Sequence, residues 1–480
     1  MKVVTRFAPS PTGFMHIGGI RTALFAYLWA RKNNGTFILR IEDTDKEREV
    51  AGSIKHIQET LSWLGIGWDY GPDKPGPFGS CIQSERLDSY KEFAQKLLDK
   101  GLAYPDPHSP EEVEALKKRA EAEKRPFLIR EHRPETFEKW DGTKPLRFKV
   151  PTVKRWKWND AVRGELEAGE EAVDDFIIVK IDGYPTYNFA HIIDDHLMGV
   201  THVLRGDEFI SSTPRFLSLY EGLGFEPPVL CTLPPILRDD RTKKLGKRDG
   251  AKDALEYRTE GFLPEAMLNC LAFLGWHPSD DRELLTAQEI MQEFTLERIQ
   301  RAGAVFSEEK LAWFNHHYIL KLSDEAFTDH AGTFLPEWLH SHSPMLKRLV
   351  PVIREKISIF SEIPALFADT GELAFVKTIA DYPKESLLWK KAPDAAKSKT
   401  HLEEAKKLMS AVADDSFTAD NIKAAIWPYA EANGKGDVLW PLRMSLTGQE
   451  KSPDPFMSAH ILGKEESLKR IGIALAKLNA

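Results

Sequence analysis

The sequence predicts an α/β protein that begins with a doubly wound parallel sheet and ends in an all-helical region. Strand-length apolar runs alternate with amphipathic helical runs over residues 1–100, which is the order that produces a parallel sheet covered by helices. Short strands dominate residues 101–190, and strand alternation almost disappears after residue 320. With 480 residues the chain is too long for one core, so several domains are expected.

The first hundred residues contain strands and helices in alternation. Strands are expected at "VVTRFA" and "TFILRIED". Between them, a run starting at Ile20 has apolar residues at helical spacing, and Gly35 is suited to end that helix. Ser53 opens the next helix and Ser84 a third, which ends at Gly101.

The next block is predicted to be a β-rich insertion into the first domain. Ser109, Pro110 and Glu112 form a capping box at the start of a charged helix. A strand follows at "LRFKVP", and Asp182-Gly183 predicts a hairpin turn between "DFIIVKI" and "YPTYNFAHII".

The alternating pattern then resumes at "THVLRGDEF", "TPRFLSLYEGLG" and "PPVLCTLPPIL", and a basic loop, "RDDRTKKLGKRDG", ends it. From about Ala251 the chain is predicted to be helical. Pro264 starts the run "PEAMLNCLAFLGW", and later helix-length runs include "LKRLVPVIREKISIFSEIPALF" and "ESLKRIGIALAKLN".

Composition narrows the class of protein. The hydrophobic fraction of 42% and charged fraction of 29% are typical of a soluble globular protein. No apolar run has the roughly 20 residues that span a bilayer, and the N-terminus lacks the features of a signal peptide. Cys81, Cys231 and Cys270 are far apart and form no CxxC pair, so we expect a reducing, cytoplasmic location. The net charge of −8 does not point to a nucleic-acid partner, but it leaves room for a local basic track.

Two short motifs carry most of the chemistry. In "SPTGFMHIGG", a strand meets a helix, and Gly18 and Gly19 let a ligand approach the backbone. A helix N-terminus suits phosphate, and His16 could donate to a phosphoryl oxygen there. In "KKLGKR", Lys244 and Lys247 could close over a triphosphate and follow its charge. Each motif alone also fits an ordinary turn or a solvated basic loop; together they bracket a split nucleotide fold.

The two motifs also carry a family resemblance. "PSPTGFMHIGG" resembles the HIGH signature of class I aminoacyl-tRNA synthetases, and "KLGKR" resembles their KMSKS loop. "RFAPSPTG", "LRIEDTD", "YPTYNFA", "DDHLMGVTHVLRGDEFISSTPR" and "GFLPEAMLNCLAFLGW" are similar to bacterial-type glutamyl-tRNA synthetases. The resemblance runs from Lys2 to about Trp276 and continues more weakly to the end of the chain.

The resemblance implies a role for each region. Residues 1–100 and 191–250 would form the two halves of a Rossmann-type catalytic domain, the second carrying the lysine loop. Residues 101–190 would be an acceptor-stem-binding insertion, 251–320 a helical stem-contact domain, and 321–480 the all-helical anticodon-binding domains.

The resemblance also assigns site residues. Those implied for glutamate are Arg6, Ala8, Ser10, Glu42, Tyr187, His191 and Arg205; those implied for ATP are His16, Gly18, Gly19, Glu208, Leu237, Lys244 and Lys247. Among these, His16 and the two lysines would be catalytic. An arginine fork suits a carboxylate because it binds both oxygens, whereas Glu42 would hold the ammonium group. Glu42 and Asp43 also fit a surface acidic turn, an alternative that the preceding strand makes less favoured.

The implied reaction has two steps. Glutamate and ATP, with Mg²⁺, would give glutamyl-adenylate and pyrophosphate, and the 3′ end of tRNA-Glu would then accept the glutamate. The family implies that bound tRNA is needed for efficient activation, that the protein is a monomer, and that no membrane takes part. No structural zinc is expected, because the stretch "AYPDPHS" has Asp106 and His108 where many relatives have cysteines. With His132 these residues could in principle bind another metal.

Three further features depart from the family or stay ambiguous. Gly246 stands where the lysine loop usually has serine, and we expect activity to persist because both lysines remain. His191 replaces a common asparagine, and its charge is expected to vary near neutral pH. "VKRWKWND" mixes basic and aromatic residues, which fits both a half-buried strand and an RNA-binding face.

Four alternatives remain to be separated. A glutaminyl-tRNA synthetase would usually end in β-barrels, and a truncated relative that glutamylates a tRNA base would stop near the basic loop. An enzyme that activates a small acid such as pantoate would lack the helical tail, and a non-catalytic RNA-binding paralogue would be expected to lose His16, the lysines or the Arg6 and Glu42 pair. Whether tRNA-Gln is also charged stays open.

Overall fold

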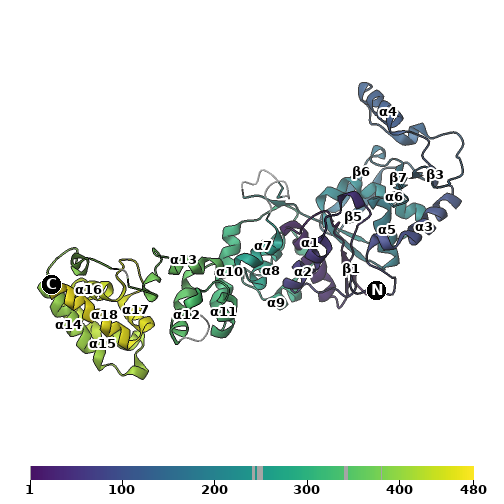
Figure 1. Ribbon diagram of the computed structural model, residues 1–480. Coiled ribbons are helices and arrows are strands. Elements are labelled where there is room, and N and C mark those ends of the chain that lie inside the picture. The colour runs from purple at the N-terminus through teal and green to yellow at the C-terminus, as the bar shows by residue number, and fades with distance from the viewer. Residues whose placement is uncertain (1, 240–243, 246–251, 340–343, 380, 480) are drawn as a thin grey trace. The chain divides into compact units, whose positions relative to one another are not determined.

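The structure of this chain is a computed structural model that describes residues 2–239, 244–245, 252–339, 344–379 and 381–479. The chain forms two compact units. The N-terminal unit comprises residues 1–259 and 263–314, and the C-terminal unit comprises residues 260–262 and 315–480. Figure 1 labels the helices and strands of both units.

A six-stranded sheet forms the centre of the N-terminal unit. Its strand order is β2-β1-β8-β9-β5-β6, and every neighbouring pair is parallel except the last. The strands are β1 (Val4–Phe7), β2 (Thr36–Leu39), β5 (Trp156–Asp160), β6 (Gly164–Ala168), β8 (His202–Gly206) and β9 (Val229–Leu233). The predicted parallel, doubly wound sheet is therefore confirmed.

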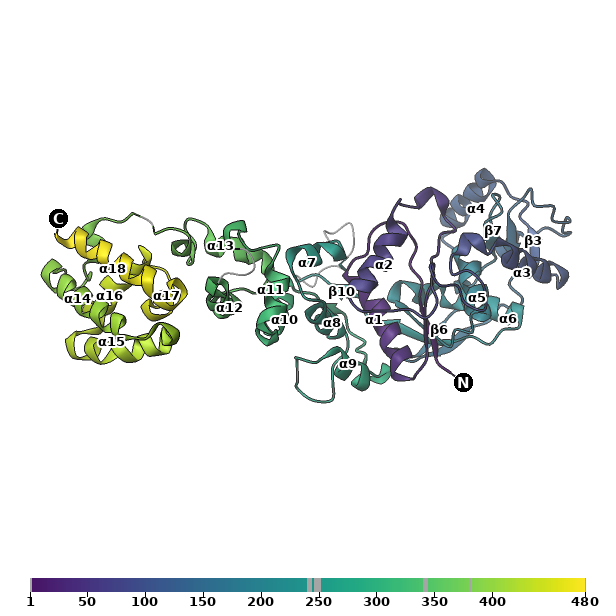
Figure 2. The same cartoon turned by 60° about the horizontal axis from the view of Figure 1, so that its bottom comes forward.

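Helices cover this sheet. One helix, α1, contacts β1, β2 and β8, and its other side contacts α8 and α9 (Figures 1 and 2). The helices of the unit are α1 (Ile17–Lys32), α2 (Ser53–Trp63), α3 (Leu87–Asp99), α4 (Pro110–Ala122), α5 (Tyr187–Leu197), α6 (Thr213–Leu223), α7 (Ala254–Glu260), α8 (Pro264–Ala272), α9 (Ala287–Glu293) and the start of α10 (Glu308–Lys321). The predicted capping box is present at α4, where Ser109 and Glu112 satisfy each other's backbone amides.

One predicted helix start is wrong. Ser84 does not open a helix, because α3 begins at Leu87 after a 3₁₀ turn over Gln83–Glu85. The backbone amide and the hydroxyl of Ser84 instead donate to Asp43, at 2.8 and 2.5 Å. Asp43 is 2% exposed and also accepts from Lys46, so its carboxylate anchors the loop after β2.

The insertion contributes to two different sheets. Strands β3 (Ala103–Pro105), β4 (Leu146–Phe148) and β7 (Phe176–Val179) form a separate antiparallel sheet. The β5–β6 hairpin comes from the same stretch of sequence but extends the main sheet. In β5 the side chains alternate between buried and exposed positions, so "VKRWKWND" contains the half-buried strand that was one of its two interpretations.

The predicted hairpin around Asp182-Gly183 is only partly correct. The turn is present, with Gly183 at a φ of +82°. The second arm is reduced to a single bridge at Pro185, and Tyr187 then starts helix α5. Phe189, Ala190, Ile192 and Ile193 are all fully buried, a helical spacing that overrides strand alternation.

A short parallel pair joins β10 (Ile236–Leu237) to β11 (Ala304–Val305), and β11 lies in the region that was expected to be helical. The C-terminal unit contains helices and no β-strand among its described residues. Its helices are α11 (Asp324–Ala331), α12 (Pro344–Lys356), α13 (Ile363–Phe367), α14 (Ala395–Ala411), α15 (Ala419–Asn433), α16 (Lys435–Thr447), α17 (Pro455–Leu462) and α18 (Lys464–Asn479). The run "LKRLVPVIREKISIFSEIPALF" is two helices rather than one, since α12 ends at Lys356.

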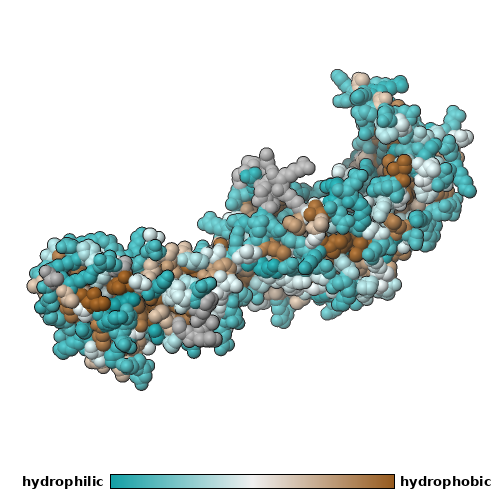
Figure 3. All heavy atoms as spheres, viewed as in Figure 1, coloured by the Kyte–Doolittle hydropathy of each residue, from teal (hydrophilic) through white to brown (hydrophobic). Residues whose placement is uncertain are grey.

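The visible face of the molecule is mostly hydrophilic, and hydrophobic residues form only small patches on it (Figure 3). Within the described parts of the chain, no helix combines the length and the apolar character that crossing a membrane requires.

Candidate active site

A cavity of about 380 Å³ opens at the carboxyl ends of the parallel strands of the N-terminal unit. Its walls come from the segment after β1, from Glu42 beyond β2, from the end of β8 and from the start of α1. Ligands bind at this edge of doubly wound sheets because neighbouring strand ends leave a crevice there.

The cavity gathers most of the residues that the sequence predicted. Those that line it are Arg6, Ala8, Ser10, His16, Gly18, Gly19, Glu42, Tyr187, Arg205, Glu208 and Lys244. Leu237 is not among the lining residues, although its neighbour Ile236 is. His191 lies in a smaller cavity behind this one. Lys247, like Gly246, lies outside the described residues.

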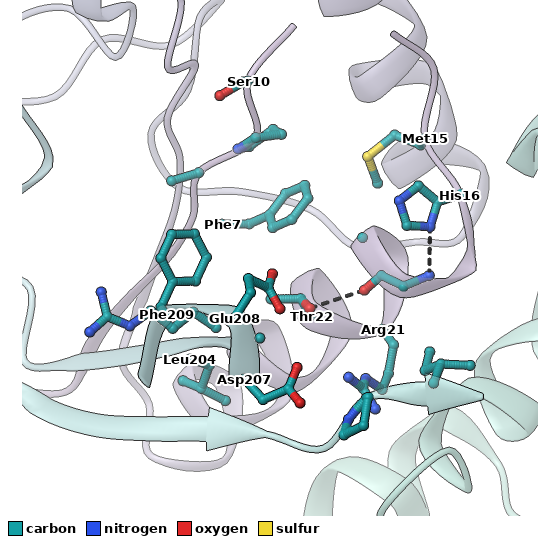
Figure 4. Close-up of a pocket in the computed structure, with 18 of the residues that line it drawn as sticks. Phe7, Ser10, Met15, His16, Arg21, Thr22, Leu204, Asp207, Glu208 and Phe209 are labelled. Carbon is teal, nitrogen blue, oxygen red and sulfur yellow. Dashed lines mark hydrogen bonds between the residues drawn. The ribbon is translucent and has the colours of Figure 1, made fainter. Parts of the chain in front are cut away.

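His16 is the residue that caps helix α1. Its Nδ1 accepts a hydrogen bond from the amide of Gly18 at 3.2 Å (Figure 4). A neutral imidazole bound in this way carries its proton on Nε2, which is then the nitrogen able to donate. A Cβ on Gly18 would lie 3.0 Å from the imidazole ring, so glycine is what lets the ring sit against the helix end. The result is a donor beside the positive end of a helix dipole.

Lys244 faces two carboxylates in the same cavity. Its Nζ lies 2.6 Å from Glu208 Oε2 and 3.2 Å from Asp207 Oδ1. Figure 4 shows these two carboxyl groups across the cavity from His16. Partial burial lowers the pKa of Lys244, but the hydrogen bonds and charges of the two carboxylates outweigh it and raise the pKa above its ordinary value. The lysine is therefore a stable cation.

Two buried charges of opposite sign stand at the inner end of the cavity. Arg6 is 4% exposed and Glu42 is 6% exposed. Burial raises the pKa of Glu42 above its ordinary value, and the guanidinium groups of Arg40 and Arg6 oppose that rise.

Two residues behind this pair were missed by sequence reasoning. Asp195 Oδ1 accepts from Arg6 Nε at 3.1 Å and from an Arg40 terminal nitrogen at 2.7 Å, and Arg40 also donates to Glu42 Oε1 at 3.0 Å. Burial would raise the pKa of Asp195, but Arg6 and Arg40 hold it well below its ordinary range. Arg40 stands in "LRIED" two residues before Glu42, so a strand alternation argument could have placed both on one face.

Arg205 provides a second cation at this end. Its guanidinium lies over the rings of Phe216 and Phe209, 4.8 and 5.3 Å from their centres, and donates to the hydroxyl of Thr213 at 3.4 Å. Burial lowers the pKa of Arg205 from its ordinary value, yet arginine stays charged because that value starts near 12.5. A buried cation of this kind favours an anionic ligand.

The expectation that the charge of His191 varies near neutral pH is wrong. His191 is 2% exposed, its ring stacks on Tyr187 at 4.7 Å, and its Nδ1 donates to the carbonyl of Tyr187 at 2.7 Å. Burial lowers its pKa to about 3. The imidazole is therefore neutral at pH 7 and supports the wall of the main cavity formed by Tyr187.

A second cavity of about 660 Å³ shares three residues with the first: Ser10, Glu42 and Tyr187. Its remaining wall includes Lys46, Arg48 and Lys180, together with acidic residues of the same two loops. Lys180 is held between the carbonyl of Thr44 at 3.2 Å and Asp182 at 2.9 Å. This second cavity therefore adjoins the end of the main cavity that contains Glu42.

The polar residues of the insertion loop are engaged with one another. Asp106 accepts from Arg147 and from His108, the latter at 3.0 Å, while the ring of His132 stacks on Phe127. Across the described parts of the chain, no group of three or more His, Cys, Asp and Glu side chains is arranged to hold a metal ion.

The C-terminal unit has a cavity of its own, of about 570 Å³. Trp389, Trp427 and Trp440 line it together with Lys435 and other basic residues. The ammonium group of Lys435 lies 4.3 Å from the centre of the Trp427 ring. Aromatic faces beside cations are what single-stranded nucleic acids bind.

Comparison with known proteins gives the family. Residues 2–313 match the family described as "tRNA synthetases class I (E and Q), catalytic domain", and residues 326–475 match "Anticodon binding domain". The chain is 40% identical over 490 residues to the glutamate–tRNA ligase of Clostridium botulinum, which covers 100% of this chain and 99% of that protein. This chain belongs to the glutamate–tRNA ligase family of class I tRNA synthetases. The Clostridium acetobutylicum member is 39% identical, with 99% of both chains covered.

Two solved structures of the family are similar to this chain over its whole length. A glutamate–tRNA ligase from Elizabethkingia meningosepticum, crystallised in complex with its amino acid, has a TM-score of 0.87 at 36% identity and covers 100% of both chains. The glutamate–tRNA synthetase of Elizabethkingia anophelis has a TM-score of 0.84 at 36% identity, with 99% of this chain and 100% of that chain covered. These similarities extend through the helical C-terminal unit.

Proposed function

We propose that this protein activates L-glutamate with ATP and transfers the glutamyl group to the 3′ end of tRNA-Glu, acting as a cytoplasmic monomer. The observation that supports the proposal is that one cavity contains both a set of charges complementary to an amino acid and a set of donors suited to phosphate. Arg6, Arg205 and Glu42 offer counter-charges for an amino acid with two carboxylates, and His16 and Lys244 lie in the same cavity as donors for phosphate.

The amino-acid end has a complementary group for each charge of glutamate. Arg6 and Arg205 bind the carboxylates and Glu42 binds the ammonium group. The backbone of Ala8, the hydroxyl of Ser10 and the ring of Tyr187 complete the site.

The other end handles ATP. The His16 Nε2 proton meets the phosphates, and Gly18 and Gly19 place no side chain between them and the backbone at the start of α1. Lys244 and Lys247 stabilise the negative charge of the phosphates. Glu208 and Leu237 are assigned to the ribose and adenine side.

The first step is an in-line displacement. A carboxylate oxygen of glutamate attacks the α-phosphorus, the bond from that phosphorus to the bridging oxygen breaks, and pyrophosphate leaves with its electron pair. No covalent bond to the protein forms, so catalysis rests on positioning and on cations placed where negative charge develops.

The carboxylate of Asp207 is a hard oxygen donor in this cavity, and together with phosphate oxygens it suits Mg²⁺. When bound with ATP, the ion would neutralise part of the triphosphate charge.

The second step needs the 3′ end of tRNA beside the adenylate. We assign the terminal nucleotides to the cavity lined by Lys46, Arg48 and Lys180, because it meets the main cavity at Ser10, Glu42 and Tyr187. The terminal ribose hydroxyl then attacks the activated carbonyl and AMP leaves. The tryptophan-lined cavity of the C-terminal unit, within the segment that matches an anticodon-binding domain, is assigned to unstacked tRNA bases.

The test is ATP–pyrophosphate exchange with glutamate, glutamine or pantoate, each with and without tRNA-Glu, followed by aminoacylation of tRNA-Glu and tRNA-Gln. Exchange with glutamate that requires tRNA, followed by charging of tRNA-Glu, supports the proposal. Exchange with another acid, or no exchange under any condition, overturns it. Exchange with glutamate in the absence of tRNA contradicts the tRNA requirement alone.

A further inference from the structure

Asp195 and Arg40 lie behind the amino-acid end of the main cavity and do not line it. Arg40 is 0% exposed and Asp195 is 2% exposed. The hydrogen bonds between these two residues and their neighbours form one continuous chain in the order Arg6, Asp195, Arg40, Glu42. The chain therefore joins the cationic and anionic groups that are assigned to opposite charges of glutamate.

The contacts leave the outer edges of both end groups for a ligand. Arg6 donates to Asp195 through Nε, so this contact does not use the two terminal nitrogens of the guanidinium group. Arg40 holds Oε1 of Glu42, which fixes the plane of the carboxylate while Oε2 remains for another donor. Each side chain is thus held at one edge, the arrangement that preorganises a binding group.

The charges within this buried group balance before any ligand is bound. Arg6 and Arg40 carry two positive charges, and Glu42 and Asp195 carry two negative charges. Arg205 adds one further cation at the same end of the cavity, so the buried cluster has a net charge of +1. Glutamate, with two carboxylates and one ammonium group, supplies a charge of −1, whereas glutamine supplies none.

We propose that Asp195 and Arg40 are positioning residues that set the orientation of Arg6 and Glu42 and thereby the affinity of the protein for glutamate. This inference rests on the proposed function for the identity of the ligand. Neither residue touches the substrate; each acts through the side chain that it holds.

The experiment measures glutamate binding by calorimetry, and exchange kinetics in the presence of tRNA-Glu, for Asp195→Asn. The substitution keeps the shape of the side chain but removes the charge that accepts from two arginines. We expect the Kd and KM for glutamate to rise at least about tenfold, because both guanidinium groups lose a buried counter-charge, and the KM for ATP to change less than about threefold.

The matched control is Asp194→Asn. Asp194 is the adjacent residue, is 0% exposed, and accepts from Arg86, Gln83 and Tyr90 at 2.7 to 2.8 Å, but it holds no group of the cavity. If Asp195→Asn only loosened the fold, the control would show the same change in glutamate affinity, and the proposal would fail.

A double-mutant cycle tests whether the effect passes through Arg6. Arg6→Lys lacks the Nε donor, so the combined effect of Arg6→Lys and Asp195→Asn on the Kd should be smaller than the product of their single effects. Independent effects overturn the proposal. Should Asp195→Asn fail to fold, Arg40→Lys carries the same test, since an ammonium group retains the charge but not the planar fork that reaches Asp195 and Glu42 together.

The two readouts separate this inference from the proposed function. Absence of exchange in the unmodified protein refutes the proposed function. Unchanged glutamate affinity in Asp195→Asn and in Arg40→Lys refutes the positioning role, even where exchange in the unmodified protein is normal.

Discussion

His56 Nε2 lies 2.7 Å from Asp253 Oδ1, and the contact joins helix α2 to the segment that directly follows the lysine loop. The other ring nitrogen accepts from the amide of Met15 at 3.4 Å, next to His16. Nε2 therefore carries the proton and donates to Asp253. The amide of Ala254 also donates to the carbonyl of Met15 at 3.0 Å. His56 thus connects both segments of the proposed nucleotide site to helix α2.

We expect His56→Ala to lower the kcat of pyrophosphate exchange by about tenfold to a hundredfold, the effect of losing a hydrogen bond to a charged partner. The KM for glutamate should not change, because His56 does not line the main cavity. His108→Ala is the matched control, since that histidine bonds to an aspartate at 3.0 Å in the insertion loop. Normal kcat in His56→Ala, or an equal loss in the control, would contradict the link between the motifs.

Lys244→Ala should reduce kcat for exchange by about a hundredfold to a thousandfold, the cost of removing one preorganised donor to developing charge. Rapid-quench measurement of adenylate formation separates this step from product release. Lys310→Ala serves as control: its ammonium group also bonds two carboxylate oxygens, those of Glu283 at 2.9 and 3.0 Å, but it lies outside the cavity. A decrease in kcat of less than about threefold in Lys244→Ala would show that Lys244 is not a catalytic residue.

His191 should make the N-terminal unit sensitive to acid. Its pKa is about 3 in the folded protein and about 6.5 when unfolded, so the unfolded chain alone binds a proton between these values. Stability therefore falls as the pH drops from 6.5 toward 3, and at pH 5 the loss relative to pH 8 is about 2 kcal/mol. His191→Asn should lose about 2 kcal/mol less than the unmodified protein over that range, as measured by urea unfolding. Identical pH dependence in the two proteins would show that His191 does not titrate on unfolding.

Trp427→Ala should weaken tRNA binding through the C-terminal unit. Loss of one base-stacking aromatic residue typically costs about 1–3 kcal/mol, so the Kd for tRNA-Glu should rise at least about fivefold in a filter-binding assay. The KM for glutamate should stay the same. Trp338→Ala provides the comparison, because Trp338 is 41% exposed in the same unit but does not line the cavity. Equal affinities for unmodified protein and Trp427→Ala would exclude stacking at this position.

Local sequence patterns were enough to predict strands β1, β2, β4, β7, β8 and β9 and most helix starts of the N-terminal unit. An apolar run such as "VVTRFA" next to a helical run predicts a buried strand. Ser109 and Glu112 predict a helix N-cap without information from the rest of the chain. The second hairpin arm was predicted wrongly because Pro185 removes a strand donor and the buried residues beyond it follow helical spacing. Whether this segment forms a strand or a helix depends on how it packs against other elements.

The site was predictable where a residue touches the cavity and much less so behind it. His16 and Lys244 stand in recognisable motifs, and Glu42 ends a strand. Asp195 gave no signal, since its partners Arg6 and Arg40 are far away in the sequence and meet it only after the sheet forms. The neutral state of His191 likewise follows from burial that no short stretch encodes.

Strand β1 pairs on one side with β2 and on the other with β8, and the amide of Val4 donates to the hydroxyl of Thr201, 197 residues later. During synthesis at 5–20 residues per second, the N-terminal strand therefore waits roughly 10–40 s for its second neighbour. The strands of the smaller antiparallel sheet, β3, β4 and β7, all leave the ribosome before β8 does. Each new molecule thus completes the insertion while one edge of β1 is still open, and during that interval the open edge can pair with another chain.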